Sequence, residues 1–266
     1  MAPQNGRSQK KRVVDSTKSN QSNSLPTMVS KPSFSVFRLA TALLLTGTHA
    51  LASPSNTVNE DSQHTRRLAF NDRFDSFDEG VWKCEYTCPV IEGGKARFRL
   101  QSGVEPDNYG SWSKATYRDQ KFTSGRFTVS FSLTSRPEEA VWWGVALWDD
   151  GPSDDEFNEI NFGYTSDQSY TNTQLRFESA KLGKFESLKV DTGVDLYDEQ
   201  YHNATLEYDS GRVALYFDGE LLQEIKDESL IPADPMELVL GPRLVSGSAP
   251  LSQGFTQSID WVEIEN

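Results

Sequence analysis

A carboxylate and an amide alternate with apolar residues in the segment Glu159-Ile160-Asn161-Phe162. Successive side chains of a β-strand point to opposite faces, so the two polar side chains share one face and the two apolar ones share the other. An ionisable side chain is costly to bury in an apolar strand without a partner. This cost favours a functional role for Glu159 in a cleft. Asn161 either works beside it or satisfies backbone groups in the interior.

Glu156 is the glutamate closest to this pair in the sequence. Its spacing of three residues from Glu159 places the two carboxylates on opposite faces of a regular strand, and a β-bulge is needed to bring them together. The acidic run from Asp149 to Glu156 indicates a solvated loop or, because hard oxygen ligands cluster there, a structural calcium site. We expect the loop, and we predict no bound metal and no cofactor.

Three tryptophans precede this segment in a nearly continuous apolar run, residues 141–148, which predicts a strand buried on both faces. Because side chains alternate, about half of the tryptophans can turn toward a cleft, and the rest pack in the core. All three are candidate ligand-binding residues: Trp142, Trp143 and Trp148.

Two arginines add candidate polar contacts for a ligand. Arg176 shares one strand face with Glu178, where the two either contact a ligand or form an ion pair at the rim of the cleft. Arg243, in Gly-Pro-Arg-Leu-Val, is the next basic residue that we expect near the cleft.

The elements that must position these side chains are short β-strands. Residues 125–133 alternate strictly and put four apolar side chains on one face. Asp218-Gly219 is typical of a two-residue hairpin turn. Further strands are expected at residues 97–100, 141–148, 159–164, 173–178, 187–191, 202–209, 212–217, 221–225 and 257–264. Helical periodicity is almost absent, so the pattern predicts one all-β domain, a sandwich or a barrel, over residues 68–266.

The charge distribution separates the start of the chain from the rest. The 266 residues carry 26 Lys and Arg against 39 Asp and Glu, a net charge of −13. Residues 1–52 hold seven of the basic residues and one acidic residue, so residues 53–266 carry a net charge of −19. Such a surface repels phosphate and anionic lipid. We therefore expect no nucleic-acid partner and no membrane insertion.

The first 67 residues resemble targeting and lead segments rather than a folded domain. Residues 1–27 are polar and read as a disordered or mis-assigned extension, and residues 28–52 have the basic, apolar and Ala-x-Ala regions of a secretory signal peptide. Residues 53–67 form a polar lead or a short propeptide, with an alternative cut after Arg66-Arg67. We expect a secreted protein.

In an exported chain we expect two covalent modifications, a disulfide and an N-linked glycan. Two cysteines, Cys84 and Cys88, are separated by three residues, and in a secreted chain a local disulfide is expected. Such a small loop adds little entropic stabilisation. Asn203-Ala204-Thr205 is an acceptor site for an N-linked glycan.

Four stretches occur in an order that resembles a known family: Ser124–Val129, Val141–Trp148, the pair His202–Tyr208 and Val213–Leu222, and Ser258–Ile264. They are similar to the Gly-Arg-Phe-Glu strand, the cleft strand, the hairpin and the closing Val-Asp-Trp-Val-Arg-Val strand of glycoside hydrolase family 16, in the concanavalin A-like lectin/glucanase superfamily. The resemblance covers residues 68–266. It implies a concanavalin A-like β-sandwich, or jelly roll, with a concave ligand cleft lined by aromatic residues.

The catalytic strand of that family reads Glu-x-Asp-x-Glu or Glu-x-Asp-x-x-Glu, and a retaining mechanism needs its two carboxyl groups about 5–5.5 Å apart. The resemblance places Glu159 at the nucleophile and Asn161 at the middle aspartate. The acid/base position then falls on Gly163 or, with a bulge, on Tyr164, and neither is a carboxylic acid. Losing general acid catalysis typically costs about 10²–10⁴-fold in rate. The motif therefore looks degraded, and Glu159, Asn161 and Tyr164 are the candidate catalytic residues.

Three functions fit this altered cleft. The first is non-hydrolytic cyclisation of an apolar small molecule, implied by a likeness to the secreted hetero-Diels–Alderases of fungal tropolone-sesquiterpenoid biosynthesis. Such a step needs two reactants held in a near-attack pose and is helped by a hydrogen-bond donor. The second is hydrolysis or transglycosylation of β-glucan with another acid, and the third is lectin-like carbohydrate binding. We expect the first, and the partner in each case is a small-molecule or oligosaccharide ligand.

Overall fold

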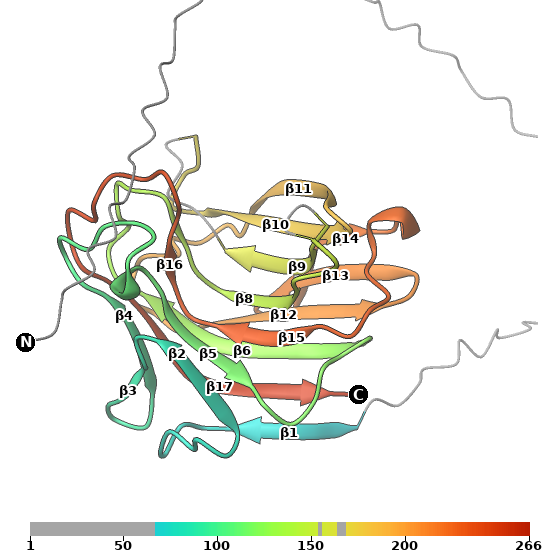
Figure 1. Ribbon diagram of the computed structural model, residues 1–266, viewed down its shortest axis with the longest axis horizontal. Helices are drawn as coiled ribbons and strands as arrows, with labels where there is room; N and C mark the ends of the chain where they lie inside the picture. Colours follow the sequence, from blue (N-terminus) through green and yellow to red (C-terminus); the bar gives the residue numbers. More distant parts are fainter. Residues whose placement is uncertain (1–66, 154–155, 164–168) are drawn as a thin grey trace, which may run out of the picture. The chain divides into compact units, whose positions relative to one another are not determined.

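The computed structural model describes residues 67–153, 156–163 and 169–266. In these residues the regular structure is almost entirely β-strand, apart from two short 3₁₀ helices, η1 (Tyr109–Ser111) and η2 (Glu228–Leu230). The strands form two large antiparallel sheets and one small one (Figure 1). The predicted all-β sandwich is confirmed. The expected extension, signal peptide and nearly all of the polar lead lie outside the described residues.

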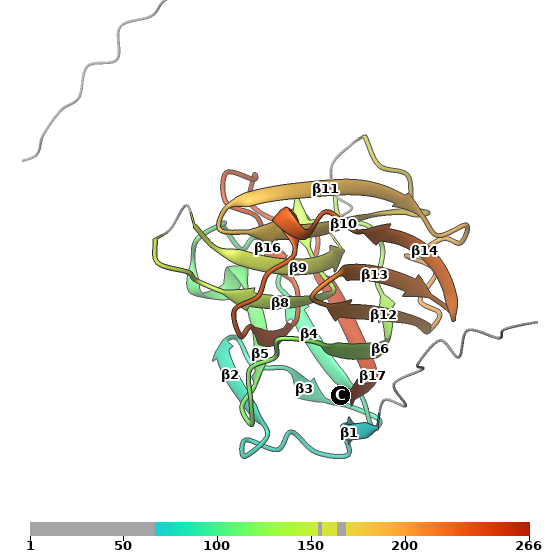
Figure 2. The same cartoon turned by 90° about the vertical axis from the view of Figure 1, so that its right-hand side faces the viewer.

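The first large sheet has eight strands, with β1 joined to one of its central strands. Its order is β14-β13-β12-β6-β17-β4-β3, and β1 pairs with β17 (Figure 2). The strands are β1 (Leu68–Asp72), β3 (Val90–Ile91), β4 (Ala96–Leu100), β6 (Gly125–Leu133), β12 (His202–Asp209), β13 (Arg212–Phe217), β14 (Glu220–Ile225) and β17 (Phe255–Glu265).

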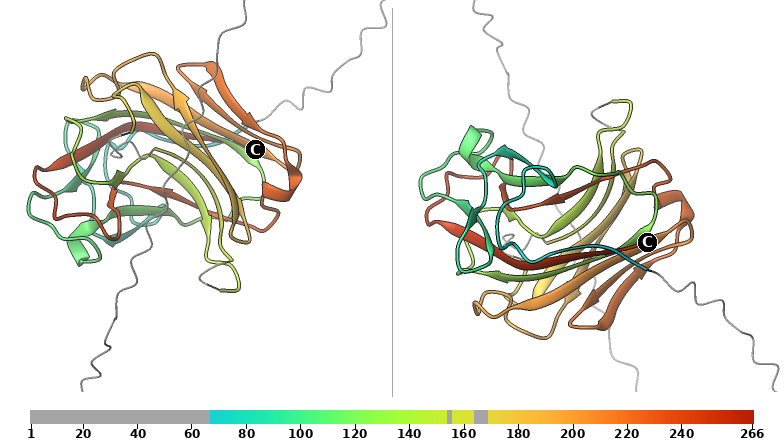
Figure 3. Two further views of the ribbon diagram at one scale, coloured as in Figure 1. Left: turned by 90° about the horizontal axis from the view of Figure 1, so that it is seen from above. Right: turned by 90° about the horizontal axis from the view of Figure 1, so that it is seen from below.

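The second large sheet has seven strands in the order β11-β10-β9-β8-β15-β5-β2. They are β2 (Trp82–Tyr86), β5 (Ser113–Tyr117), β8 (Val145–Asp149), β9 (Asn158–Gly163), β10 (Gln174–Lys181), β11 (Lys184–Asp191) and β15 (Glu237–Leu240). The short strands β7 (Val141–Trp142) and β16 (Arg243–Leu244) pair with each other. Figure 3 shows the two large sheets face to face, with their strands curving around the space between them.

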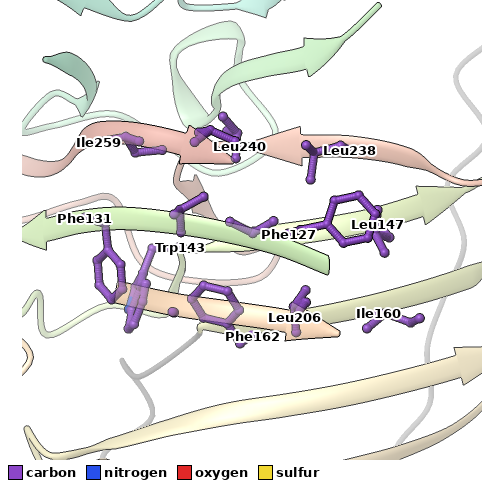
Figure 4. Packing of buried hydrophobic residues seen from close by; sticks show 14 of the residues in the cluster. Phe127, Phe131, Trp143, Leu147, Ile160, Phe162, Leu206, Leu238, Leu240 and Ile259 are labelled. Carbon is purple, nitrogen blue, oxygen red and sulfur yellow. The ribbon is translucent and has the colours of Figure 1, made fainter. Parts of the chain in front are cut away.

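The core fills the space between the two large sheets. The strict alternation of β6 turns Phe127, Val129, Phe131 and Leu133 inward, and all four are buried. Figure 4 shows Phe131 beside Trp143 and Phe162 of the other layer, and the ring centroids of Phe131 and Trp143 are 5.3 Å apart. Burial of large apolar side chains such as these is the main stabilising contribution to the sandwich.

The apolar run at residues 141–148 departs from the prediction in two ways. It forms two strands, β7 and β8, separated at Trp143 and Gly144, where Gly144 takes a φ of +118°. The expectation that both faces are buried is wrong, because Trp142 and Trp148 stay half-buried on the face that is turned away from the core. Val145 and Leu147 pack in the core, whereas Ala146 between them is buried on the outer face.

Candidate functional site

A cleft of about 690 Å³ lies on the face of the seven-stranded sheet that is turned away from the core. This volume is within the range of small-molecule sites. Six of the candidate catalytic and ligand-binding residues line it, together with Glu178: Trp142, Trp148, Glu159, Asn161, Arg176 and Arg243. The structure thus brings these residues into one site, and their roles in binding or catalysis remain predictions.

The strand register places Glu159 at the centre of this face. Glu159 pairs with Trp148 of β8 on one side and with Ala180 of β10 on the other. Asn161, two residues further along β9, pairs with Ala146 and with Glu178. Residues two apart on one strand point to the same face. The cleft side of β8, β9 and β10 therefore carries two carboxylates and an amide next to a tryptophan.

The pKa of Glu159 is raised from 4.5 to about 8, mainly because the carboxyl group is buried and also because of the nearby negative charge of Glu178. A hydrogen bond from Asn161 and the positive charges of Arg243 and Arg176 act in the opposite direction, but they are outweighed. Glu159 is consequently a neutral carboxylic acid at pH 7, which can donate a proton or a hydrogen bond.

Asn161 connects Glu159 to the aromatic wall of the cleft. Its side chain is almost fully buried, with 3% of its surface exposed. The indole N–H of Trp142 donates to the amide oxygen of Asn161 over 3.4 Å, and the Asn161 side chain is in turn hydrogen-bonded to Glu159. Asn161 is therefore placed to orient the acid and the tryptophan ring together.

Arg176 and Glu178 are neighbours on the cleft face of β10. An Arg176 Nη1 atom lies 3.8 Å from Oε2 of Glu178, and the Glu178 side chain is 13% exposed. This is the ion pair that the sequence offered as one alternative. Since both residues also line the cleft, the pair forms part of its polar wall.

Gly163 cannot carry a catalytic side chain. It takes a φ of +123°, and a Cβ atom added to it would lie 1.4 Å from the carbonyl oxygen of Trp143. Gly144 shows the reciprocal approach, because its Cβ would lie 2.2 Å from the carbonyl oxygen of Phe162. The two backbones pass so closely that the position has room for glycine alone. The other candidate for the acid/base position, Tyr164, lies outside the described residues.

Trp143 is corrected from a ligand-binding candidate to a core residue. It is 1% exposed, and its ring lies 6.2 Å from that of Phe162, centroid to centroid, on the inner side of the sheet. The physical reason is alternation, which turns Trp142 to the cleft and its neighbour to the core.

Three residues that sequence reasoning missed also line the cleft: Tyr86, Trp112 and Lys114. Tyr86 lies in β2, Trp112 directly precedes β5 and Lys114 lies in β5, and neither strand was predicted. Tyr86 lies inside the Cys84–Cys88 loop, so its position between the cysteines was the available signal. The structure confirms the predicted disulfide between Cys84 and Cys88.

Other sequence features fall outside the cleft or outside the described residues. Asn203 is exposed at the start of β12, where a glycan remains a prediction. Asp154 and Asp155 of the acidic run are not described. Within residues 67–153, 156–163 and 169–266, no group of three His, Cys, Asp or Glu side chains is placed to hold a metal ion. In the same residues no helix is long and apolar enough to cross a membrane.

Solved glycosidase structures share the fold of this chain. A β-1,3-1,4-glucanase (lichenase) from a mouse hindgut metagenome is 18% identical, with a TM-score of 0.57 over 73% of this chain and 97% of that one. The laminarinase catalytic domain of Thermotoga petrophila is 14% identical, with a TM-score of 0.60 over 76% and 98%. The κ-carrageenase of Pseudoalteromonas carrageenovora is 13% identical, with a TM-score of 0.56 over 79% and 98%. At these identities the likeness shows the jelly-roll fold.

A comparison with curated protein sequences found no match. A family model described as the concanavalin A-like lectin/glucanases superfamily matches residues 107–266, which is more than half of the chain and includes β5 to β17. By this match and by its two-sheet sandwich, the chain belongs to the concanavalin A-like lectin/glucanases superfamily.

Proposed function

We propose that the cleft binds a small, partly apolar molecule and promotes its cyclisation without hydrolysis, in a reaction of the hetero-Diels–Alder type. The observation that carries the proposal is the closed position at Gly163, where the backbone oxygen of Trp143 excludes any side chain. Strand β9 therefore offers one carboxyl group, Glu159, rather than the two that a retaining glycosidase places about 5–5.5 Å apart.

The residues of the cleft suit such a reaction. Trp142 and Trp148 line one cleft with Glu159, and an aromatic wall can hold two apolar reactants in contact. Holding the reactants in a near-attack geometry can remove a large part of the activation free energy of a cycloaddition. The neutral Glu159 donates a hydrogen bond to a carbonyl oxygen of the heterodiene, which polarises it, and no proton is transferred. Asn161 acts as the positioning residue, since it is hydrogen-bonded to Glu159 and accepts from Trp142.

The first test is hydrolysis of lichenan and laminarin by the purified wild-type protein, measured as reducing sugar. We expect no release above the background of a heat-treated sample. Release at ordinary glucanase rates, on the order of 1–10³ per second, would show that the cyclase proposal is wrong.

The second test supplies an o-quinone methide, generated in the reaction mixture, and an apolar alkene. The uncatalysed cycloaddition gives a racemic product, so we expect an enantiomeric excess with the wild-type protein. Glu159→Gln keeps a hydrogen-bond donor and should retain much of this excess, whereas Glu159→Ala should lose most of it. A racemic product with the wild-type protein would count against the proposal.

A second candidate function rests on Glu178. It lies on the strand next to Glu159 and faces the same cleft, and its charge raises the pKa of Glu159. Hydrolysis or transglycosylation of a glycan could then use Glu159 as the acid and Glu178 as the second carboxylate, with the tryptophans as a stacking surface for sugar rings. In that case Glu159→Gln and Glu178→Gln would each lower the turnover rate of a polysaccharide by about 10²-fold or more.

Export through the secretory pathway, with a signal peptide at residues 28–52 and a glycan on Asn203, belongs to the same proposal. The disulfide Cys84–Cys88 supports it, because disulfides persist in oxidising compartments. Expression of the full chain in a secreting host, followed by mass spectrometry before and after removal of N-glycans, tests both points. An unmodified Asn203 in exported protein would contradict the glycan.

A further inference from the structure

One end of the cleft combines stacked aromatic rings with positive charge. We call it the disulfide end, and it consists of Tyr86, Trp112, Lys114 and Arg243, all of which line the cleft. The rings of Tyr86 and Trp112 are stacked, with centroids 5.3 Å apart and an interplanar angle of 19°. The cationic groups of Lys114 and Arg243 lie 4.8 and 4.9 Å from the centroid of the Trp112 ring.

The backbone at this end is held in place from several sides. The Cys84–Cys88 disulfide closes the loop that carries Tyr86, whose φ of +59° is unusual for a residue with a side chain. The N–H of Thr87 donates to the carbonyl oxygen of Trp112 over 3.1 Å, and the Lys114 N–H donates to the Thr87 carbonyl over 3.2 Å. These contacts fix the two aromatic rings relative to each other before any ligand arrives.

The two cations differ in their partners. Lys114 is paired with Glu85, with Nζ 2.8 Å from Oε2. Arg243 is exposed, and no carboxylate among residues 67–153, 156–163 and 169–266 forms an ion pair with it. This is notable in a chain whose residues 53–266 carry a net charge of −19. An arginine with free N–H donors, held over an aromatic ring in a cleft, is suited to an acidic oxygen of a ligand.

The other charges of the cleft leave this end attractive to anions. Glu159 is neutral at pH 7 because its pKa is raised to about 8, and Glu178 lies next to Arg176. Asp150, which also lines the cleft, accepts a hydrogen bond from the indole N–H of Trp148 over 2.8 Å. The ionised Glu85 beside this end, with a pKa of about 2, is held by Lys114 and Lys83 and forms no ion pair with Arg243.

We propose that the disulfide end is a subsite for an anionic group of the ligand, held by Arg243, with a ring of the ligand against Tyr86 and Trp112. The inference rests on the proposed function in one respect, namely that the cleft is the ligand site. It adds the chemical class of the ligand, which is an acid such as a carboxylate or an acidic enol attached to a ring. The acid can belong to an aromatic molecule or to a uronic acid sugar.

The test compares two pairs of probes that differ in one charge. The aromatic pair is 2-naphthoate and 2-naphthamide, and the sugar pair is cellobiouronic acid and cellobiose. Binding is measured by tryptophan fluorescence and by calorimetry at about pH 6, below the pKa of about 8 of Glu159, so that this group stays protonated in every variant. The variants are Arg243→Gln and a matched control, Arg99→Gln, which removes one arginine from the eight-stranded sheet.

We expect the acid of one pair to bind the wild-type protein about tenfold or more tightly than its neutral partner. The preference should fall to about twofold or less in Arg243→Gln and remain in Arg99→Gln. The pair that shows it identifies the ligand as an aromatic acid or a sugar acid. A preference that survives Arg243→Gln, or equal binding within both pairs, overturns the anion subsite while the cleft remains a ligand site.

Failure of the proposed function has a different signature. If none of the four probes binds, both the subsite and the ligand cleft are overturned. If the acid preference depends on Arg243 but the cycloaddition stays racemic, the subsite stands and the cyclisation does not.

Discussion

The two faces of the seven-stranded sheet are built from the same strands but have opposite chemistry. The inner face carries buried apolar side chains such as Ile160 and Phe162. The outer face, from the residues between them, carries Glu159 and Asn161 in the cleft. Alternation thus separates the groups that hold the sandwich together from those available to a ligand. The comparison predicts that neighbouring residues on one strand have quite different effects when they are changed.

Gly163 is the position where the strand has no room for a side chain, because its backbone passes directly against the backbone of Trp143. Gly163→Ala places a methyl group 1.4 Å from a carbonyl oxygen. We expect the free energy of unfolding to fall by about 4 kcal/mol or more, so that little folded protein is recovered. The control is Gly193→Ala, which also has a positive φ, of +76°, but has nothing within 4 Å of the added methyl. It should cost about 1 kcal/mol. Equal losses in urea denaturation would contradict the close backbone passage.

Trp142 and Trp143 are adjacent in the chain but lie on opposite faces, so substituting each of them compares the two faces directly. Trp143 is buried against Phe131 and Phe162, so Trp143→Ala should lower the free energy of unfolding by about 3–5 kcal/mol. Trp142→Ala should lower it by about 1 kcal/mol but weaken probe binding in the cleft. Urea denaturation and fluorescence titration of both variants test the assignment. Similar stability losses in the two variants would mean that the faces are not separated as described.

Glu159 makes the free energy of unfolding depend on pH. Its pKa is about 8 in the folded protein and near 4.5 in an exposed chain, so the folded state holds its proton more tightly. Stability therefore falls as the pH rises from about 4.5 to about 8 and does not change further through this group above pH 8. Glu159→Gln lacks that fall, so its stability relative to wild type should increase by about 4 kcal/mol across this window. Thermal unfolding of both proteins at pH 5, 6.5 and 8 measures it, and a constant difference would contradict the raised pKa.

The disulfide is expected to have the smallest effect on stability, and its main effect should be on the cleft. A loop between residues four apart loses little entropy on closure, so the double variant Cys84→Ala/Cys88→Ala should cost about 1 kcal/mol. The Tyr86–Trp112 stack should loosen, and the affinity for 2-naphthoate should drop further than the stability change explains. Unchanged affinity would show that the hydrogen bonds of Thr87 hold this end without the disulfide.

The sequence was most informative where a strand alternates regularly. Residues 125–133, 202–209 and 212–217 were predicted with the bounds that β6, β12 and β13 have in the structure. Six of the strands in the described residues were missed: β1, β2, β3, β5, β15 and β16. Strand β5, Ser-Lys-Ala-Thr-Tyr, shows why, since it buries serine, alanine and threonine, so burial there does not follow hydrophobicity.

The cleft was predictable in part for a related reason. The common face of Glu159 and Asn161 follows from local alternation alone. By contrast, the closure at Gly163 and the aromatic pair Tyr86 and Trp112 depend on which distant segments pack together. The periodicity of a single sequence does not contain that information. The prediction therefore placed Trp143 among the ligand contacts and, of the disulfide end, included only Arg243.

The position of β17 has a consequence for synthesis of the protein. This strand, residues 255–265, lies between β6 and β4 and also pairs with β1, so it joins segments from both ends of the domain. A nascent chain that stops before residue 255 would expose two unpaired strand edges, which are prone to aggregation. The eight-stranded sheet can therefore be completed only after these residues have left the ribosome. Pairing of such distant segments also predicts slow folding.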